Sequence, residues 1–553
     1  MRSFIFLLLL IGIPLPSYAQ LSPRQKADDF LAIVASYDRL YAPLPLVTKE
    51  SGFNPLHVKP WVEGAKVTAS DAEFYQLCRR YLARFGNTQD TLNLTPGPLF
   101  GATLGFTINY YSNTLLIDSI DRDALPETQY PFQIGDQLLS VDHRSIDQWL
   151  DALTSLLAAV NPDLRRSLAA NLIVNRKNPM LPFTPQPGDM ATITVRRQNG
   201  RVEDYSVKWV VQGTAVAEFG PLRAQAPPPA PASPLANVLA NRHVPPGALP
   251  ALGVGALQPI FQLPDDFQQH LGASPSDAFF SGIYQADGYR IGFLRIGTFL
   301  LQNPRAAIQQ LDEEVQYLGQ NTDGLILDLM RNDGGNANYQ DQVAQRFFHT
   351  TFKTLPEQIR PTQSVVQAAA DALATALRAN PPDQDLIDHL RQVYDELNSA
   401  YTHGQRLTRP LLLRNTTALL GPARDQAGNV IAYSKPILLL VDENTGCGAE
   451  AFAAVFQDNQ RGPIAGKRTQ GAGGALELTP GGYFSEATLT ITRTLFVREQ
   501  PGSGKLSYIQ NAGVTPDIFL DFMTKENLTG GGRAFVRGFT RSMVSHLRAP
   551  SHP

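Results

Sequence analysis

The chain has 553 residues, enough for about three or four domains, and 43% of them are apolar, enough to bury several hydrophobic cores. Charged residues make up 18% and the formal net charge is −3. This balance argues against a nucleic-acid or anionic-membrane partner, because either would require clustered Lys and Arg side chains.

The first residues have the pattern of a secretory signal peptide. Arg2 supplies a positive charge, residues 4–13 are apolar, and Ser17-Tyr18-Ala19 fits a small-x-small cleavage site. The apolar run is too short to cross roughly 30 Å of hydrocarbon as a helix. We therefore expect residues 1–19 to be removed. The mature chain would then be exported to the periplasm or outside the cell, without a membrane span.

Residues 20–95 are predicted to form a helical domain, because residues 27–38 and 71–85 place apolar side chains at helical spacing. Cys78 lies in the second run, where a small buried hydrophobe on a helix face is the simpler interpretation. The other cysteine is Cys447, and a disulfide between the two stays open until their distance is known.

Residues 96–215 have the pattern of a β domain. A Gly-Asp turn at residues 135–136 leads into an apolar-rich strand, which resembles the core motif of PDZ domains. These domains take up peptide ends by adding a strand to a sheet edge. An ordinary hairpin with an acidic turn is the alternative. A helical stretch at 147–175 departs from a minimal PDZ domain.

Residues 216–275 are predicted to be a linker, because their dense prolines favour an extended spacer. Strands and helices then alternate over residues 276–528, with fully apolar runs that indicate buried strands. A polar segment at 364–430, helical over 364–403, resembles an insertion. Residues 529–553 are predicted to be a C-terminal tail.

Two features of this α/β region can carry chemistry. A predicted strand ends just before Cys447 and a helix begins just after it, so this side chain would stand beside the free N–H groups of a helix N-terminus. Such a position suits an acyl-transfer nucleophile, although a packed free cysteine is the plainer interpretation. Glycine-rich loops at 328–336 and 466–474 allow backbone N–H groups to approach a substrate carbonyl closely.

The order of these elements resembles the tail-specific, or C-terminal-processing, serine peptidases, and most of all their chlamydial protease-like activity factor branch. This resemblance implies an α/β, multi-domain fold with a helical N-terminal segment, a PDZ-like β domain and a crotonase-like protease domain. The matching pieces are residues 331–336, the turn at Cys447, and residues 457–459, 468–474, 497–499 and 509–514.

In the family, a serine before the helix attacks the peptide carbonyl, and its base is a lysine, or a histidine oriented by a glutamate. The family also implies oxyanion donors, here the backbone of Gly334, Gly335 and Gly448. This sequence departs from the family at each position that would take part in catalysis. It has Cys447 for the serine, Ala472 for the lysine, Gln89 for the histidine and Gln510 for the glutamate.

An amide cannot accept a proton near neutral pH, so we expect a catalytically impaired protein. No Cys/His spacing resembles a zinc site, and we expect no metal or cofactor. It would bind extended peptides or protein C-termini between its protease and PDZ-like domains, and a homodimer stays open. One alternative is an active peptidase that uses Cys447; another is a structural or assembly protein of the cell envelope that docks through the insertion. For the active peptidase, the candidate bases are Lys467, Lys435, His57 and His349.

Overall fold

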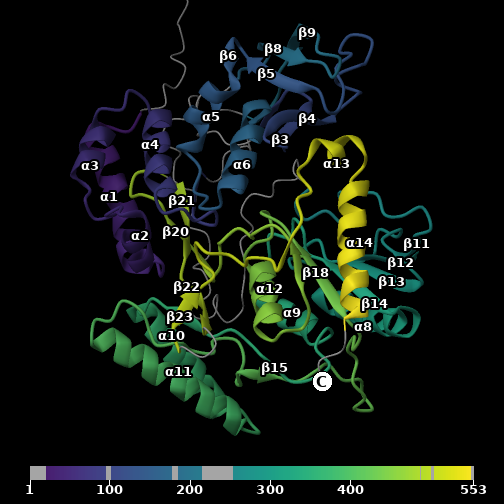
Figure 1. Cartoon of the computed structure of the whole chain (residues 1–553). Coiled ribbons are helices and arrows are strands. Elements are labelled where there is room, and N and C mark those ends of the chain that lie inside the picture. The colour runs from purple at the N-terminus through teal and green to yellow at the C-terminus, as the bar shows by residue number, and fades with distance from the viewer. Residues whose placement is uncertain are drawn as a thin grey trace, which may run out of the picture.

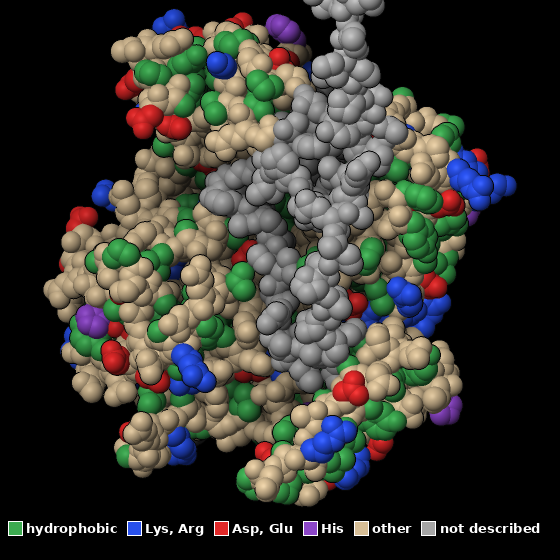
Figure 2. Space-filling model, turned by 180° about the vertical axis from the view of Figure 1, so that it is seen from behind, with side chains coloured by type: hydrophobic (Ala, Val, Ile, Leu, Met, Phe, Trp, Pro, Cys, Tyr) green, Lys and Arg blue, Asp and Glu red, His purple; other side chains and the backbone are tan. Residues whose placement is uncertain are grey.

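The computed structural model describes residues 20–94, 101–176, 185–213, 253–485, 487–499 and 504–549. The predicted signal peptide at 1–19 and most of the predicted linker lie outside these residues. Within them, no helix is both long and apolar enough to cross a bilayer. On the face shown in Figure 2, acidic and basic side chains are interspersed and the apolar ones lie in small groups.

The N-terminal segment is helical, as predicted, and contains α1 (Pro23–Leu40), α2 (Leu44–Ser51), α3 (Lys59–Lys66) and α4 (Asp71–Ala83) (Figure 1). Ser22 caps the start of α1 and forms a reciprocal capping box with Gln25. The core between these helices is rich in aromatic rings, and side chains of β21 (Ala487–Thr492) close it. The strand β1 (Thr91–Leu94) pairs antiparallel with β21, so this segment is joined to the C-terminal half.

The second unit is a sheet in the order β3-β4-β5-β8-β9, in which β6 adds to β5 and β3 is an edge strand. Helix α6 packs against β3 and α5 packs against β5. A small sheet of β2, β7 and β10 lies beside them. The bounds are β2 (Gly101–Thr103), β3 (Phe106–Tyr111), β4 (Thr114–Ile120), β5 (Gln137–Val141), β6 (Arg144–Ser145), α5 (Ile146–Thr154), α6 (Pro162–Val174), β7 (Asn175–Arg176), β8 (Met190–Arg196), β9 (Val202–Lys208) and β10 (Val210–Gln212).

The third unit is built on a seven-stranded sheet in the order β11-β12-β13-β14-β18-β19-β24, parallel from β13 onward. Every residue of β14 and β18 is buried, because helices cover both faces. The elements of the sheet and its covering helices are β11 (Gln268–Leu271), β12 (Phe280–Ala286), β13 (Tyr289–Arg295), α8 (Pro304–Asn321), β14 (Gly324–Asp328), α9 (Ala337–Ala344), β18 (Ile437–Val441), α12 (Gly448–Asp458), β19 (Ile464–Gly466), β24 (Ile518–Phe519) and α14 (Arg533–Arg548).

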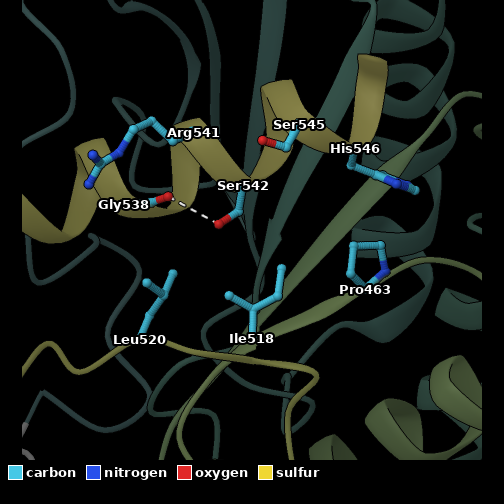
Figure 3. Close-up of a pocket in the computed structure, with 8 residues that line it drawn as sticks. All are labelled: Pro463, Ile518, Leu520, Gly538, Arg541, Ser542, Ser545 and His546. Carbon is cyan, nitrogen blue, oxygen red and sulfur yellow. Dashed lines mark hydrogen bonds between the residues drawn. The ribbon is translucent and has the colours of Figure 1, made fainter. Parts of the chain in front are cut away.

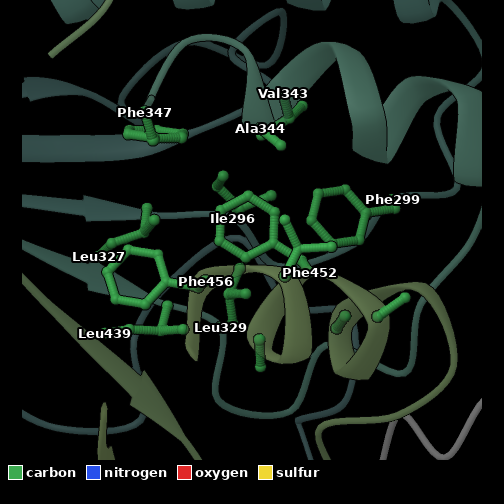
Figure 4. Close-up of a cluster of buried hydrophobic side chains, with 14 of the residues drawn as sticks. Ile296, Phe299, Leu327, Leu329, Val343, Ala344, Phe347, Leu439, Phe452 and Phe456 are labelled. Carbon is green, nitrogen blue, oxygen red and sulfur yellow. The ribbon is translucent and has the colours of Figure 1, made fainter. Parts of the chain in front are cut away.

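The alternation of side chains along the central strands fills a core on each face of this sheet. Leu327 and Leu439 point toward α9 and α12, where they meet Phe452 and Phe456 (Figure 4). Their neighbours along the strands point to the other face, where α14 covers them. The sequence places a C-terminal tail from residue 529, but residues 533–548 form α14 and belong to this core.

The predicted insertion contains two paired helices, which Figure 1 shows below the N-terminal helices. Two short strands precede it, of which one pairs with a strand inside the insertion and the other with a strand that follows α12. These remaining elements are β15 (Phe352–Lys353), β16 (Glu357–Ile359), α10 (Gln363–Arg378), α11 (Gln384–Thr402), β17 (Leu419–Leu420), β20 (Leu476–Pro480), β22 (Thr494–Glu499), β23 (Leu506–Tyr508) and α13 (Lys525–Thr529). Strand β22 pairs with β16 on one side and β23 on the other.

Candidate active site

Cys447 lies at the sharp turn between β18 and α12, as the sequence predicts. It is the residue before the helix, with φ 51° and ψ −117°, a backbone conformation that is costly for any residue with a Cβ. The turn is held by Asp442, whose Oδ1 accepts from the backbone N–H of Asn444 at 3.0 Å and of Arg331 at 2.9 Å. The Cys447 N–H donates to the Ala472 carbonyl at 2.8 Å. Both predicted glycine loops therefore meet at this turn.

Glu450, in the first turn of α12, fixes the second of these loops. Its Oε1 accepts from the Thr469 hydroxyl and from the Gly471 N–H at 2.6 Å, and its Oε2 accepts from the Ala472 N–H at 2.8 Å. Burial raises the pKa of this carboxyl to about 7, against the effect of these hydrogen bonds. Glu450 was not among the predicted site residues. An acidic residue inside an otherwise apolar helix was the available signal.

The three glycines predicted as oxyanion donors lie together around Cys447. A Cβ added to Gly334 would lie 2.6 Å from Cys447 Cβ, and a Cβ added to Gly448 would lie 3.5 Å from the Gly335 nitrogen. The Gly334 N–H donates to Asn332 Oδ1 at 2.9 Å in this structure. The Gly448 N–H hydrogen-bonds Cys447, so the role of the three glycines as oxyanion donors stays a prediction.

The thiol of Cys447 is only 1% exposed, and this burial raises its pKa to about 12. Hydrogen bonds from the Gln89 side chain and the Gly448 N–H lower the pKa, but by less, and the carboxyls of Glu450 and Asp333 raise it further. The guanidinium of Arg414 also acts on Cys447, yet it is already bound between two carboxylates. Burial therefore outweighs the lowering of a thiol pKa that a helix N-terminus favours.

Gln89, predicted at the base position, does reach the nucleophile position. It comes from the segment before β1, which Asp90 holds in place by accepting from the Thr492 N–H at 2.9 Å. The Thr88 hydroxyl donates to Gln470 Oε1 at 3.1 Å, which ties the same segment to the glycine loop. The Gln89 amide then hydrogen-bonds the Cys447 sulfur.

Gln510, predicted at the position of the orienting acid, is buried behind the glycine loop. Its Nε2 donates to Asn511 Oδ1 at 3.0 Å, and its Oε1 accepts from the Gly473 N–H at 3.4 Å. Gly473 follows Ala472, whose carbonyl accepts from Cys447. The residues at the predicted nucleophile, base and orienting-acid positions, Cys447, Gln89 and Gln510, therefore lie around one loop.

The other candidate bases are either bound to other groups or exposed. Lys467 Nζ lies 2.7 Å from the Asp163 carboxylate and within 4 Å of those of Glu443 and Asp521. Lys435 Nζ donates to the Thr322 carbonyl at the start of β14 and β18, whereas Cys447 follows the end of β18. His57 and His349 are both exposed, in the loop before α3 and after α9.

Both cysteines are free, which settles the question of the disulfide. Among the described residues, no group of acidic, histidine and cysteine side chains could hold a metal ion. A hollow of about 590 Å³ between α14 and β24 lies away from this site (Figure 3). Its Ser542 hydroxyl is bonded to the Gly538 carbonyl within the helix, at 3.1 Å.

Comparisons with known proteins agree with this architecture. The sequence profile of peptidase family S41 matches residues 290–520, and that of a PDZ domain matches residues 101–218. This chain is an S41 peptidase homologue with a PDZ domain. The S41 match contains Cys447 and Gln510 but not Gln89, which lies in the N-terminal helical segment.

The S41 homologue also resembles chlamydial proteins along most of its length. A protein of Chlamydia pneumoniae is 23% identical over 496 residues, 76% of this chain and 74% of the relative. A carboxy-terminal-processing protease of Bartonella bacilliformis is 27% identical over 187 residues, 34% of this chain and 39% of the relative. A structure of mature CPAF complexed with lactacystin superposes with a TM-score of 0.75 at 19% identity, covering 95% of this chain and 99% of that one. This last likeness concerns the fold.

Proposed function

We propose that this S41 homologue binds extended polypeptide segments and does not hydrolyse them. The observation that carries the proposal is the hydrogen bond between the Cys447 sulfur and an amide, that of Gln89. In a thiol or serine peptidase this neighbour must take the proton of the nucleophile, and an amide has no basic lone pair near neutral pH.

The protonation state of the thiol leads to the same conclusion. With a pKa of about 12, on the order of one thiol in 10⁵ is ionised at pH 7, and the thiolate is the nucleophile. Gln510 cannot stabilise a charged base either, because its carboxamide carries no charge. The loss of such members from a serine-peptidase triad costs several powers of ten in rate.

Peptide binding is supported by the PDZ domain. Its edge strand β3 lies beside α6, and an edge strand offers unpaired backbone groups to an added strand. Asn161, just before α6, donates through Nδ2 to the carbonyls of Arg468 and Thr469 at 2.9 and 3.0 Å. A peptide seated against β3 and α6 would therefore be close to elements that touch the loop over Cys447.

The test measures cleavage of denatured casein and binding of a fluorescent unstructured peptide by the full mature chain. We expect no cleavage above that of Cys447→Ala, together with saturable binding that weakens when the peptide C-terminus is amidated. Cleavage by the natural chain that is lost in Cys447→Ala would establish an active thiol peptidase instead.

A gain of activity tests the assignment of the positions. The combined variant Cys447→Ser, Gln89→His, Gln510→Glu supplies a nucleophile, a base and an orienting acid, and we expect it to cleave casein. The matched control keeps the His and Glu substitutions but carries Cys447→Ala. Equal rates for both variants would show that Gln89 does not occupy the base position.

A further inference from the structure

A second polar site lies away from Cys447, where the N-terminal helices meet the predicted insertion. A cavity of about 760 Å³ opens between the end of α1, the start of α10, the end of α11 and β20. Its wall carries more positive than negative charge. The charged side chains that line it are Asp38, Arg39, Arg360, Arg406 and Glu477.

A fully buried arginine lies behind this wall. The Arg493 side chain is only 1% exposed, and its Nη2 donates to the hydroxyl of Thr362, a lining residue, at 3.4 Å. Its Nε is 3.4 Å from the Glu477 carboxylate, without the alignment of a hydrogen bond, and its Nη1 has no hydrogen-bond partner. Buried guanidinium groups are normally satisfied by several acceptors.

Arg360 shows the same deficit on the cavity wall. Its Nη2 donates to the Asp38 carbonyl and its Nε to the Arg39 carbonyl at 3.4 Å, whereas its buried Nη1 has no hydrogen-bond partner. Burial, and then the charge of Arg406, lower the pKa of Arg360 against the effect of Asp38. Burial, and then the charges of Arg360 and Arg39, lower that of Arg493 against the effect of Glu477. The cluster is therefore short of negative charge and of acceptors.

The start of α10 adds further donors. Thr362 caps this 16-residue helix by accepting from the Val365 N–H, and residues 362–364 line the cavity. Backbone N–H groups in a first helical turn have no partner inside the helix and favour an anion. The carboxylates of Asp38 and Glu477 oppose an anion, but each already faces an arginine.

We propose that this cavity binds a phosphate-class dianion. The cavity and its wall hold four guanidinium groups and two carboxylates, which leaves two positive charges. These are Arg39, Arg360, Arg406 and Arg493 against Asp38 and Glu477. A dianion balances both charges, whereas a monocarboxylate balances one. A tetrahedral oxyanion also has enough acceptor atoms to meet donors that come from different directions, and arginine is well suited to phosphate. The source is either free phosphate or the phosphoryl group of a larger molecule.

Calorimetric titration of the full mature chain at constant low ionic strength tests this site, with inorganic phosphate, pyrophosphate and acetate as separate ligands. We expect phosphate and pyrophosphate to bind at one site and acetate at least tenfold more weakly. Tighter binding of pyrophosphate than of phosphate would point to a phosphorylated molecule, and tighter binding of phosphate to the free ion. Either order supports the proposal, whereas the absence of binding by both, or equal binding of acetate, overturns it.

Arg406→Gln is the informative variant, because this side chain lines the cavity yet is 53% exposed, so the fold does not depend on it. We expect its Kd for phosphate to rise about tenfold, as for the loss of one charge-assisted hydrogen bond. The matched control is Arg391→Gln, which removes an exposed arginine of α11 that pairs with Asp388 outside the cavity. Equal weakening in both variants would overturn the site.

Discussion

At the scale of single residues, Cys447 is subject to two opposing influences. The helix N-terminus and the Gln89 amide favour a thiolate, whereas removal from water disfavours any charge on sulfur. Burial is the larger influence here and raises the pKa to about 12. The turn was predictable from sequence, because a strand, a glycine and a helix follow one another locally. The burial was not, because it depends on loops that come from distant parts of the chain.

The first prediction concerns the reactivity of this thiol. In a Cys78→Ala background, iodoacetamide should label Cys447 at pH 7.5 at least about a thousandfold more slowly than it labels the unfolded chain, because thiolate and access are both scarce. Mass spectrometry of the 440–460 region measures the rate. Labelling of the folded chain within a few-fold of the unfolded rate would contradict a buried, protonated thiol.

At the scale of elements, the site is built by the approach of backbone to backbone. The loop after β14 touches the turn after β18, and Gly334, at φ 102°, lies where a Cβ would be 2.6 Å from both Cys447 Cβ and the Gly448 nitrogen. The apolar runs that become β14 and β18 are plain in the sequence. The contact between the Asn332 side chain and the Gly334 N–H is not, because it depends on how the loop folds back on itself.

Gly334→Ala should therefore lower the free energy of unfolding by about 3 kcal/mol, through the clash and the positive φ. Gly319→Ala is the matched control: it lies in α8, a Cβ there meets nothing within 4 Å, and it should raise stability by about 1 kcal/mol. Urea titrations of both variants provide the measurement. A neutral effect of Gly334→Ala would mean that the two loops are farther apart in solution.

At the scale of the whole molecule, the helical N-terminal segment is part of the same structure as the S41 domain. Strand β1 pairs with β21, nearly four hundred positions later, and β21 also closes the helical core. Tyr111 of β3 and Leu116 of β4 pack with Phe522 beneath the PDZ domain. The helices and strands are evident in the sequence pattern, but the pairing of strands this far apart is not, so only the family resemblance predicted where Gln89 would lie.

The junction carries a titratable group, Asp90, and this makes the stability of the molecule depend on pH. Burial raises the pKa of Asp90 from 3.8 to about 7, against the hydrogen bonds from Thr492. The folded chain therefore holds a proton that the unfolded chain releases between these values. The stability that the protonated carboxyl contributes is fully present below pH 3.8 and is lost as pH rises through about 7.

Asp90→Asn removes this titration. From pH 5 to pH 7, the free energy of unfolding of the natural chain should fall relative to that of the variant by about 1.4 kcal/mol per pH unit. Urea titrations of both proteins at pH 5 and 7.5 measure the difference. Asp28→Asn, on the exposed face of α1, is the control and should follow the natural chain. If the stability of Asp90→Asn also follows that of the natural chain, the Asp90 carboxyl is ionised throughout this range. The pairing of β1 with β21 would then hold a charge between the two halves of the chain.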